Sequence, residues 1–204
     1  MLLLNDADHT YAKIRFDETS LDTASERLTD IEDELTRAVI WTALWNLTRD
    51  GEMSAIDYVG LVVKHEAYET NTTLLAAACA NANFAIAHYV ADADREQVRT
   101  DYAEAIWGHL AEAEPASDAQ LVLARAAIRA LAATPEESGT TRLQALLSGD
   151  IAGLRLDPEI RWSILRALAA RNAVTPAELE EEKQRDNTLT GATEFLGASH
   201  AFPT

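Results

Sequence analysis

The sequence predicts an all-α protein: a helical superhelix, or solenoid, of antiparallel helix pairs of the HEAT/armadillo kind, preceded by a short N-terminal β-hairpin. Three observations predict this fold. From Ser20 onward, helix-capping residues alternate with runs of apolar side chains spaced three and four residues apart. The pentapeptide RALAA occurs at residues 129–133 and again at residues 166–170. Before Ser20, two short runs have the pattern of paired strands.

The first 18 residues carry the strand pattern. The run LLL at residues 2–4 is followed by TYAKIRFD at residues 10–17, in which polar and apolar side chains alternate. In an extended chain, one face would present Tyr11, Lys13 and Arg15, and the other Ala12, Ile14 and Phe16. This alternation predicts a strand that is half-buried on one side. We expect either that its apolar face packs on the first helices or that its edge pairs with a second copy of the chain.

Caps and apolar spacing mark the helices of the first half. Ser20 precedes the first helix, and Gly51 ends the second, which lies within residues 30–51. Ser54 caps a third helix over residues 55–69. Asn71 or Thr72 opens a fourth, which is nearly all apolar, so we expect it to be buried on most sides. The second helix is the most strongly periodic and places on one stripe Ile31, Leu35, Ala38, Trp41, Leu44 and Trp45.

The second half continues in the same way. Ser117 precedes a helix over residues 118–133, Pro135 lies in the first turn of the next, and Asp157 with Pro158 opens another. The tail, residues 190–204, is weakly periodic and predicts a short helix with a frayed end. Between the two halves, one further helix is predicted by an apolar stripe of Val98, Tyr102, Ile106 and Leu110.

Two segments of the second half resemble each other. RAAIRALAATPEE at residues 125–137 and RWSILRALAARNAVTPAEL at residues 161–179 share RALAA at an offset of 37 residues, from 129 to 166. A helix pair that repeats near this length is typical of a helical solenoid. Alanine-rich helices also produce such matches by chance, and the sequence leaves both explanations open.

Composition limits the partners of the chain. Of its 204 residues, 34 are Asp or Glu and 17 are Lys or Arg, which gives a formal net charge of -17. This charge opposes binding to nucleic acid and to anionic membranes. No apolar run is long enough to span a membrane, and the N-terminal MLLLNDAD does not have the basic and apolar regions of a signal peptide. We therefore expect a cytoplasmic protein, in which the single cysteine, Cys79, is a small buried thiol.

The pattern nearest to a catalytic motif is HEAYE at residues 65–69. The zinc-protease motif H-E-x-x-H needs a second histidine four residues after the first, and this chain has Glu69 there. We expect the segment to lie in solvent at the end of a helix and the match to be fortuitous. The other four histidines, at positions 9, 88, 109 and 200, have no ligand spacing, and the chain has no Ser, Cys or phosphate-binding catalytic motif. The sequence therefore predicts no metal site and no catalytic residue.

Four segments together resemble a known family. They are NDADHTYAKIRFDETSL, LTRAVIWTALWNLTRDGEMSAIDYV, DPEIRWSILRALAA and EKQRDNTLTG. In this order they resemble the C-terminal region of bacterial aminopeptidase N of the actinobacterial type, a zinc-dependent gluzincin. The resemblance covers nearly the whole chain, and its most specific parts are the first two segments.

The resemblance implies a division of the chain and a role for it. Residues 1–18 would be a hairpin remnant of a preceding β-sandwich domain, with strands at 2–4 and 10–17 and a turn at Asn5–His9, and residues 19–204 would be the helical C-terminal domain. The zinc ligands of this family, its substrate-amine motif and its transition-state tyrosine belong to upstream domains. Zinc would thus be a cofactor of the parent enzyme and not of this chain, which alone would be inactive.

In this family the helical domain closes over the active-site cleft, limits the access of peptides, and in some members supplies basic side chains near the far end of the peptide. The resemblance therefore implies two kinds of partner, the upstream catalytic and β-sandwich domains of the same polypeptide and the peptide substrate. Arg129 and Arg161 are candidates for such basic residues, because each lies on a helix of the predicted repeat between apolar neighbours.

Two alternatives stay open. A free-standing helical-repeat scaffold that binds another protein would have the same helices and no catalytic groups. A small independent enzyme is the other. The reading frame upstream of Met1 distinguishes the first alternative from a domain of a larger enzyme, because only the latter continues into an H-E-x-x-H region.

Overall fold

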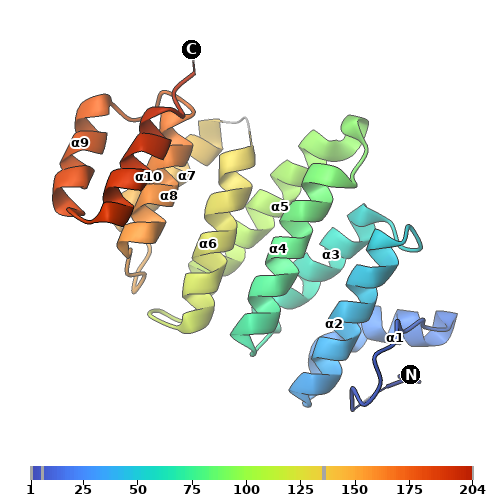
Figure 1. The fold of residues 1–204 in the computed structure, drawn as a ribbon. Coiled ribbons are helices and arrows are strands. Elements are labelled where there is room, and N and C mark those ends of the chain that lie inside the picture. The colour runs from blue at the N-terminus through green and yellow to red at the C-terminus, as the bar shows by residue number, and fades with distance from the viewer. Residues whose placement is uncertain (1, 6, 135–136, 204) are drawn as a thin grey trace. The chain divides into compact units, whose positions relative to one another are not determined.

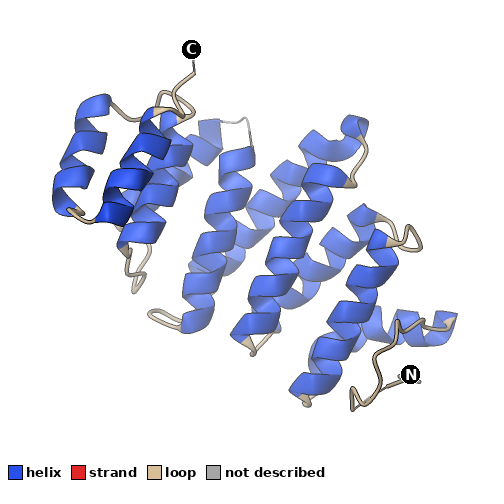
Figure 2. Cartoon of the chain, in the orientation of Figure 1, coloured by secondary structure: helices blue, strands red, loops and turns tan. Residues whose placement is uncertain are grey.

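Helices account for the regular secondary structure of the computed structural model, which describes residues 2–5, 7–134 and 137–203. No β-strand occurs in these ranges, so the predicted all-α class is confirmed (Figure 2). Two short 3₁₀ helices are η1 (Leu28–Asp30) and η2 (Glu66–Tyr68). The α-helices are α1 (Glu18–Arg27), α2 (Glu34–Arg49), α3 (Ala55–His65), α4 (Thr72–His88), α5 (Asp92–Glu112), α6 (Asp118–Ala133), α7 (Glu137–Ser148), α8 (Pro158–Ala169), α9 (Pro176–Arg185) and α10 (Leu189–Ser199).

Local capping explains where most of these helices begin. The side chains of Ser54, Asn71, Ser117 and Asp157 each accept a hydrogen bond from a backbone N–H in the first turn, as the sequence predicts. The first helix differs. Its cap is Asp17, which accepts from the backbone N–H of Ser20, so the prediction that Ser20 is the cap is wrong. An ionised carboxylate is as good a cap as a hydroxyl, and it begins the helix three residues earlier.

The chain divides into two compact units, Met1–Ala105 and Ile106–Thr204, with the boundary inside α5. In the first unit α2, α3 and α4 pack against one another, and Figure 1 shows α2 and α4 next to each other with α3 behind them. The core of this unit includes Leu44, Tyr58, Val62, Leu75 and Ala82, all of which are buried. Gly51 follows α2 in a left-handed conformation (φ +75°), the usual way for a helix to end on glycine.

The prediction that the fourth helix is buried on most sides is wrong. One face of α4 is buried, with Leu75, Cys79 and Ile86 in the core. The opposite face is exposed and consists mainly of small side chains, Ala76, Ala77, Ala80 and Ala87, with Phe84 among them. Alanine has so little apolar area that its exposure costs little, so an alanine-rich sequence predicts burial poorly.

The predicted N-terminal β-hairpin is not found in the described residues of this segment. No residue at 2–4 or 10–17 is in a strand. The predicted turn at Asn5–His9 includes Asp6, which lies outside the described residues. The Asn5 side chain joins the two arms, since its Oδ1 accepts from the Thr10 N–H (2.8 Å) and its Nδ2 donates to the Thr10 carbonyl (2.7 Å). A two-stranded hairpin is marginal without a neighbouring sheet, which explains why no ladder forms beyond this point.

The side-chain alternation of the segment is nevertheless real. Ile14 is buried against Val39 and Ala43 of α2, and Leu3 and Phe16 pack on the same cluster. On the other face, Lys13 and Arg15 both bind the carboxylate of Asp50 at the end of α2. The first of the two expectations for the apolar face, that it packs on the first helices, is therefore confirmed for Ile14 and Phe16.

In the second unit α6, α7, α8 and α10 form the packed body, and α9 packs on α10. Figure 1 shows α6 and α8 with α7 behind them. Equivalent positions of the predicted repeat are buried in both copies, Leu131 on α6 and Leu168 on α8. The predicted short C-terminal helix is α10. Pro135, predicted in the first turn of the seventh helix, lies outside the described residues. A superhelix running through the whole chain stays a prediction, as does a domain boundary after residue 18.

Candidate functional site

Arg129, the first of the two predicted cavity residues, is exposed on α6. It lines a small cavity of about 50 Å³ between α6 and the start of α8, together with Arg125, Glu159, Ile160 and Ser163. Arg125 is paired, since its guanidinium lies 3.3 Å from the carboxylates of both Asp157 and Glu159. Arg129 has no hydrogen bond or ion pair to any residue that the structure describes. Its guanidinium is therefore available to an anion.

Arg161, the second predicted residue, lies on the neighbouring helix α8 but is differently engaged. Its guanidinium binds the Glu182 carboxylate of α9 with two hydrogen bonds of 2.7 and 2.6 Å. Glu182 is almost fully buried and also lies 3.4 Å from Arg185. A bidentate pair of this geometry holds the arginine in place and leaves it less free than Arg129 to bind an external group.

The HEAYE segment lies only partly in solvent: Ala67 and Tyr68 are exposed, but the prediction is wrong for its histidine and its two glutamates. His65, Glu66 and Glu69 are each less than 5% exposed, because α3 ends there against α1 and α2. The imidazole donates from Nε2 to the Ser25 carbonyl (2.9 Å) and accepts at Nδ1 from the Thr29 hydroxyl (3.2 Å). Both ring nitrogens are thus used within the chain.

Glu69, which stands where a zinc motif has its second histidine, is the centre of a buried network. Its carboxylate accepts from Arg37 (2.8 Å), from the Trp41 indole (3.2 Å) and from the Asn71 backbone N–H (3.0 Å). Burial alone would raise the pKa of Glu69, but the hydrogen bonds from Arg37, Asn71 and Trp41 outweigh it and lower the pKa below its usual value.

These residues do not fit a zinc ion. The imidazole and the carboxylate that would have to bind the metal are satisfied by neutral and cationic partners of the chain itself. No group of three or more His, Cys, Asp or Glu side chains able to hold a metal occurs among the described residues. The network is structural, tying α2 to the segment after α3.

Cys79 is a free and buried thiol, as predicted. It donates to the buried carboxylate of Glu66 (3.5 Å), and its backbone carbonyl accepts from the Tyr102 hydroxyl (3.4 Å). Burial raises the pKa of the thiol well above its usual value. A nucleophilic cysteine needs a lowered pKa and access to substrate, so Cys79 is suited to packing and not to catalysis.

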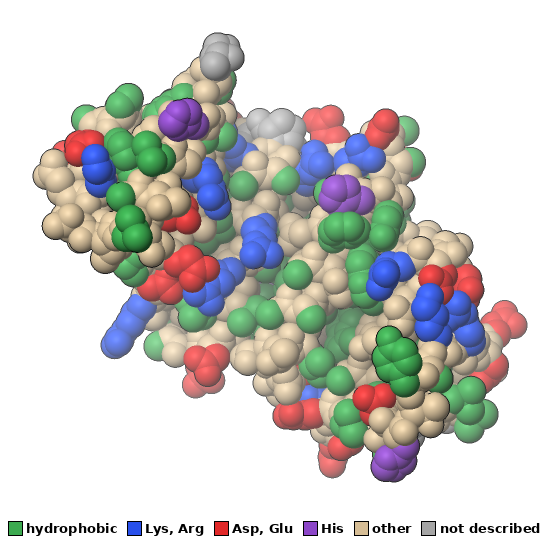
Figure 3. Space-filling model, in the orientation of Figure 1, with side chains coloured by type: hydrophobic (Ala, Val, Ile, Leu, Met, Phe, Trp, Pro, Cys, Tyr) green, Lys and Arg blue, Asp and Glu red, His purple; other side chains and the backbone are tan. Residues whose placement is uncertain are grey.

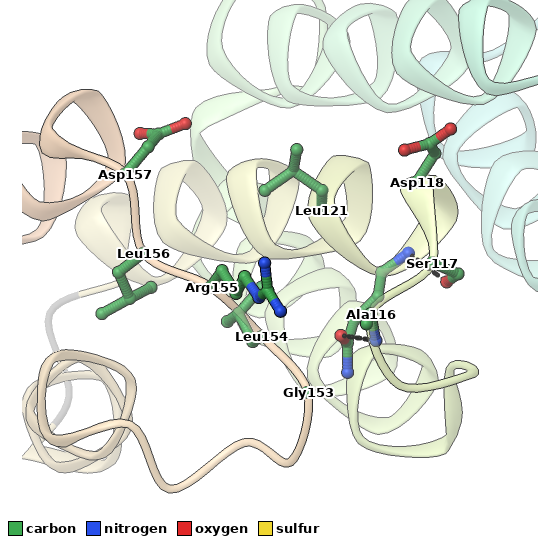
Figure 4. Close-up of a pocket in the computed structure, with 10 residues that line it drawn as sticks. Ala116, Ser117, Asp118, Leu121, Gly153, Leu154, Arg155, Leu156 and Asp157 are labelled. Carbon is green, nitrogen blue, oxygen red and sulfur yellow. Dashed lines mark hydrogen bonds between the residues drawn. The ribbon is translucent and has the colours of Figure 1, made fainter.

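A cavity of about 560 Å³ in the second unit lies between the first turns of α6 and the segment Gly153–Asp157 that leads into α8 (Figure 4). Its floor is held by Gln120, whose Oε1 accepts from the Ala116 backbone N–H (2.9 Å) and whose Nε2 donates to the Ala152 carbonyl (2.9 Å). Arg155 extends from the middle of the segment toward Leu121 of α6.

Sequence reasoning missed this groove. It singled out only Asp157, as a helix cap, although the run LRLD before Pro158 has the alternation of a short extended segment. Gly153 was a second signal. It has φ +78°, and a Cβ there would lie 2.6 Å from the Ala116 backbone nitrogen, so only glycine fits.

Several basic side chains lie next to acidic ones on the face shown in Figure 3. In the second unit, Arg125 is paired with Asp157 and Glu159, Arg161 with Glu182, and Arg166 lies 3.5 Å from Glu194. An excess of carboxylates explains this pairing. No helix in the described part of the chain has the length and apolar character needed to cross a membrane.

Comparison with known proteins agrees with the resemblance seen in the sequence. The model of the ERAP1-like C-terminal domain family matches residues 1–204. The chain is also 39% identical over 206 residues to Aminopeptidase N of Streptomyces lividans, and the match covers 100% of this chain and 24% of that protein. The chain thus spans about a quarter of the length of this relative. Since the family model covers the whole chain, the protein belongs to the ERAP1-like C-terminal domain family.

Proposed function

We propose that this chain is the helical C-terminal domain of a zinc-dependent aminopeptidase of the aminopeptidase N type, which releases N-terminal residues from peptides. The observation that carries the proposal is the identity of 39% to Aminopeptidase N over the full length of this chain. Because the match takes up only 24% of that relative, the zinc site and the catalytic groups would belong to the remainder of the polypeptide.

Within the parent enzyme, the domain would cover the active-site cleft and limit which peptides enter. Its partners would then be the catalytic and β-sandwich domains of the same chain and the peptide substrate. The N-terminal segment supports a partner on that side, because Leu2, Leu4 and Tyr11 are 67, 57 and 110% exposed. Apolar side chains so far out of a packed core suit a surface that another domain covers. A cytoplasmic location is part of the same proposal.

Arg129 is the better of the two candidates for a peptide contact. It is exposed and has no partner in the described part of the chain, whereas Arg161 is held by Glu182. An unpaired guanidinium at the edge of a helix can bind a carboxylate of a bound peptide with two hydrogen bonds. Arg161 would act on the peptide only indirectly, by fixing α8 against α9.

The test is made on the parent enzyme. The ratio of kcat/KM for a single aminoacyl amide to that for a ten-residue peptide is compared between the intact enzyme and a form without residues 19–204, with bound zinc measured to show that the catalytic part is folded. If this domain limits access, the ratio shifts in favour of the long peptide when the domain is removed. An unchanged ratio in a zinc-loaded truncated enzyme would refute the covering role.

A second comparison addresses Arg129. Arg129→Gln in the parent should raise KM for the peptide and leave the aminoacyl amide unaffected, since the small substrate does not reach this residue. Arg49→Gln is the matched control, because Arg49 is an exposed arginine of the first unit with no partner among the described residues. Equal effects of the two substitutions would remove Arg129 from the proposal.

A further inference from the structure

Figure 4 shows residues 153–157 as a stretched, non-helical segment that forms one wall of the groove beside α6. Residues 154–157 belong to no helix, and only the first of them, Leu154, donates its backbone N–H, to the Ile151 carbonyl (3.2 Å). Within the described part of the chain, the Leu156 backbone N–H and the carbonyls of Leu154 and Leu156 have no partner, and in an extended segment these groups point to the same side. These are the groups with which an extended chain adds a strand to a neighbour.

This wall is held in place before any partner arrives. Gln120 is buried, and its side-chain amide bridges the two loops that flank the groove by binding Ala116 and Ala152. Gly153 packs directly on Pro115 and Ala116 at one end of the segment, and Asp157 caps α8 at the other. A binding edge fixed at both ends loses little conformational entropy when a partner binds.

Side chains along the wall also have the pattern of a half-buried strand. Leu154 and Leu156 are half-buried, and Arg155 between them is exposed. Arg155 has no ion pair or hydrogen bond to a described residue, in a chain with twice as many carboxylates as basic groups. Its charge is therefore free to select an acidic side chain on the partner.

The ends of the groove limit how acidic the partner can be. Figure 4 shows Asp118 at one end and Asp157 at the other, with Arg155 between them. Asp157 is already paired with Arg125 and caps α8, while Asp118 lies in the first turn of α6. A run of acidic residues would meet these carboxylates, whereas a single acidic residue opposite Arg155 would not.

We propose that this groove binds an extended polypeptide segment by backbone pairing with residues 154–157, with one acidic side chain of the segment on Arg155 and its apolar neighbours over Leu121. The groove volume of about 560 Å³ is in the range of known ligand sites. The proposal concerns an internal stretch of peptide and needs no free carboxyl terminus. It does not depend on the domain covering an active site.

The test uses the 204-residue chain and the capped peptide acetyl-Thr-Val-Glu-Val-Thr-amide, followed by NMR. We expect saturable shifts confined to the backbone amides of residues 154–157 and of the first turns of α6. The matching peptide with Gln in place of Glu should bind about three- to fivefold more weakly, as loss of one exposed ion pair implies. A peptide with N-methyl groups on both Val residues should lose binding, because it cannot donate to the Leu154 and Leu156 carbonyls.

Variants of the chain test the ion pair with Arg155 separately from the backbone pairing. In Arg155→Gln, an exposed position where the fold should be unaffected, the Glu and Gln peptides should bind equally. Arg49→Gln, in the first unit, should keep the preference for Glu. The proposal fails if the Glu peptide shows no saturable binding at about 1 mM, the weak limit for a specific site. It also fails if the N-methylated peptide binds equally well, or if Arg155→Gln retains the preference. These readouts involve no peptidase activity, so they are independent of the test of the covering role.

Discussion

Arg37 and Glu69 form a bidentate ion pair in which the two side chains are 5% and 0% exposed. The guanidinium of α2 reaches the carboxylate that follows η2, and it also donates to the backbone carbonyls of Ile31 and Glu32. One side chain thereby joins the N-terminal approach to α2 with the connection from α3 to α4.

The first prediction concerns this pair. Arg37→Met should lower the free energy of unfolding by about 3–5 kcal/mol, because it leaves the Glu69 carboxylate buried without its cation. Arg37→Met combined with Glu69→Leu should recover much of the loss. Urea unfolding followed by circular dichroism measures both. The control is Arg27→Ala, which breaks the exposed Arg27–Asp30 pair and should cost under about 0.5 kcal/mol. If Arg37→Met alone cost no more than Arg27→Ala, the Arg37–Glu69 pair would contribute little to stability.

Acid should destabilise the fold partly through Glu69. The pKa of Glu69 in the folded chain lies below the ordinary value of 4.5. At pH values between the folded and the unfolded pKa, the unfolded chain therefore binds more protons than the folded one. The contribution of Glu69 to stability is therefore fully present above pH 4.5 and is lost as the pH falls through the folded pKa. Other carboxylates with lowered pKa values, such as Asp33 and Asp50, add to this slope. We expect the free energy of unfolding of Glu69→Gln to change less between pH 6 and pH 3 than that of the unaltered chain.

Cys79 should resist thiol reagents until the first unit opens. It is 2% exposed and its pKa is raised by burial, so both access and the thiolate fraction are low. We expect labelling by a maleimide at pH 7.5 to be at least about 100-fold slower in buffer than in 8 M urea, since it requires opening of the core. Labelling at similar rates in both would show that the α4 face carrying Cys79 is open in the folded chain.

The N-terminal segment should exchange its amide hydrogens much faster than α2. Backbone N–H groups of residues 11–16 have no hydrogen-bond partner among the described residues, whereas those within residues 38–49 are bonded inside the helix. Hydrogen exchange followed by mass spectrometry in dilute solution measures the difference. Protection of residues 10–17 that rises with protein concentration would indicate pairing of this edge with a second copy of the chain. Protection equal to that of α2 at every concentration would mean that the segment is a stable part of this domain.

The isolated chain should neither bind zinc at micromolar concentration nor hydrolyse aminoacyl amides. His65 offers no free nitrogen, and Glu69 would have to give up Arg37 to reach a metal. Metal analysis of a tag-free preparation after dialysis against about 10 µM zinc is the measurement, with His65→Ala as its control. Stoichiometric zinc that disappears in His65→Ala would contradict the structural role assigned to HEAYE.

What the sequence alone determined is local. Helix starts at Ser54, Asn71, Ser117 and Asp157 follow from side chains that bond to N–H groups two or three residues away, and apolar spacing selects the face that is buried. The resemblance rested on segments such as WNLTRDGE, a run of residues that the apolar spacing of an amphipathic helix does not require. The family is confirmed by the match of its model over residues 1–204. The alternation at residues 13–16 also predicted correctly which side chains face the core.

Only the tertiary structure decided what depends on residues far apart in the chain. A strand needs a partner strand, so the alternation of residues 10–17 could not show that the segment would form no ladder and would instead pack Ile14 and Phe16 on α2. Glu69 of HEAYE is a charged residue, and its burial is made possible by Arg37, 32 residues before it. The groove beside Arg155 exists because Gln120 binds the Ala152 carbonyl, again 32 residues away. Hydrogen bonds within a helical turn are set by neighbours in sequence, whereas burial, charge pairing and cavities are set by which surfaces the packed helices bring together.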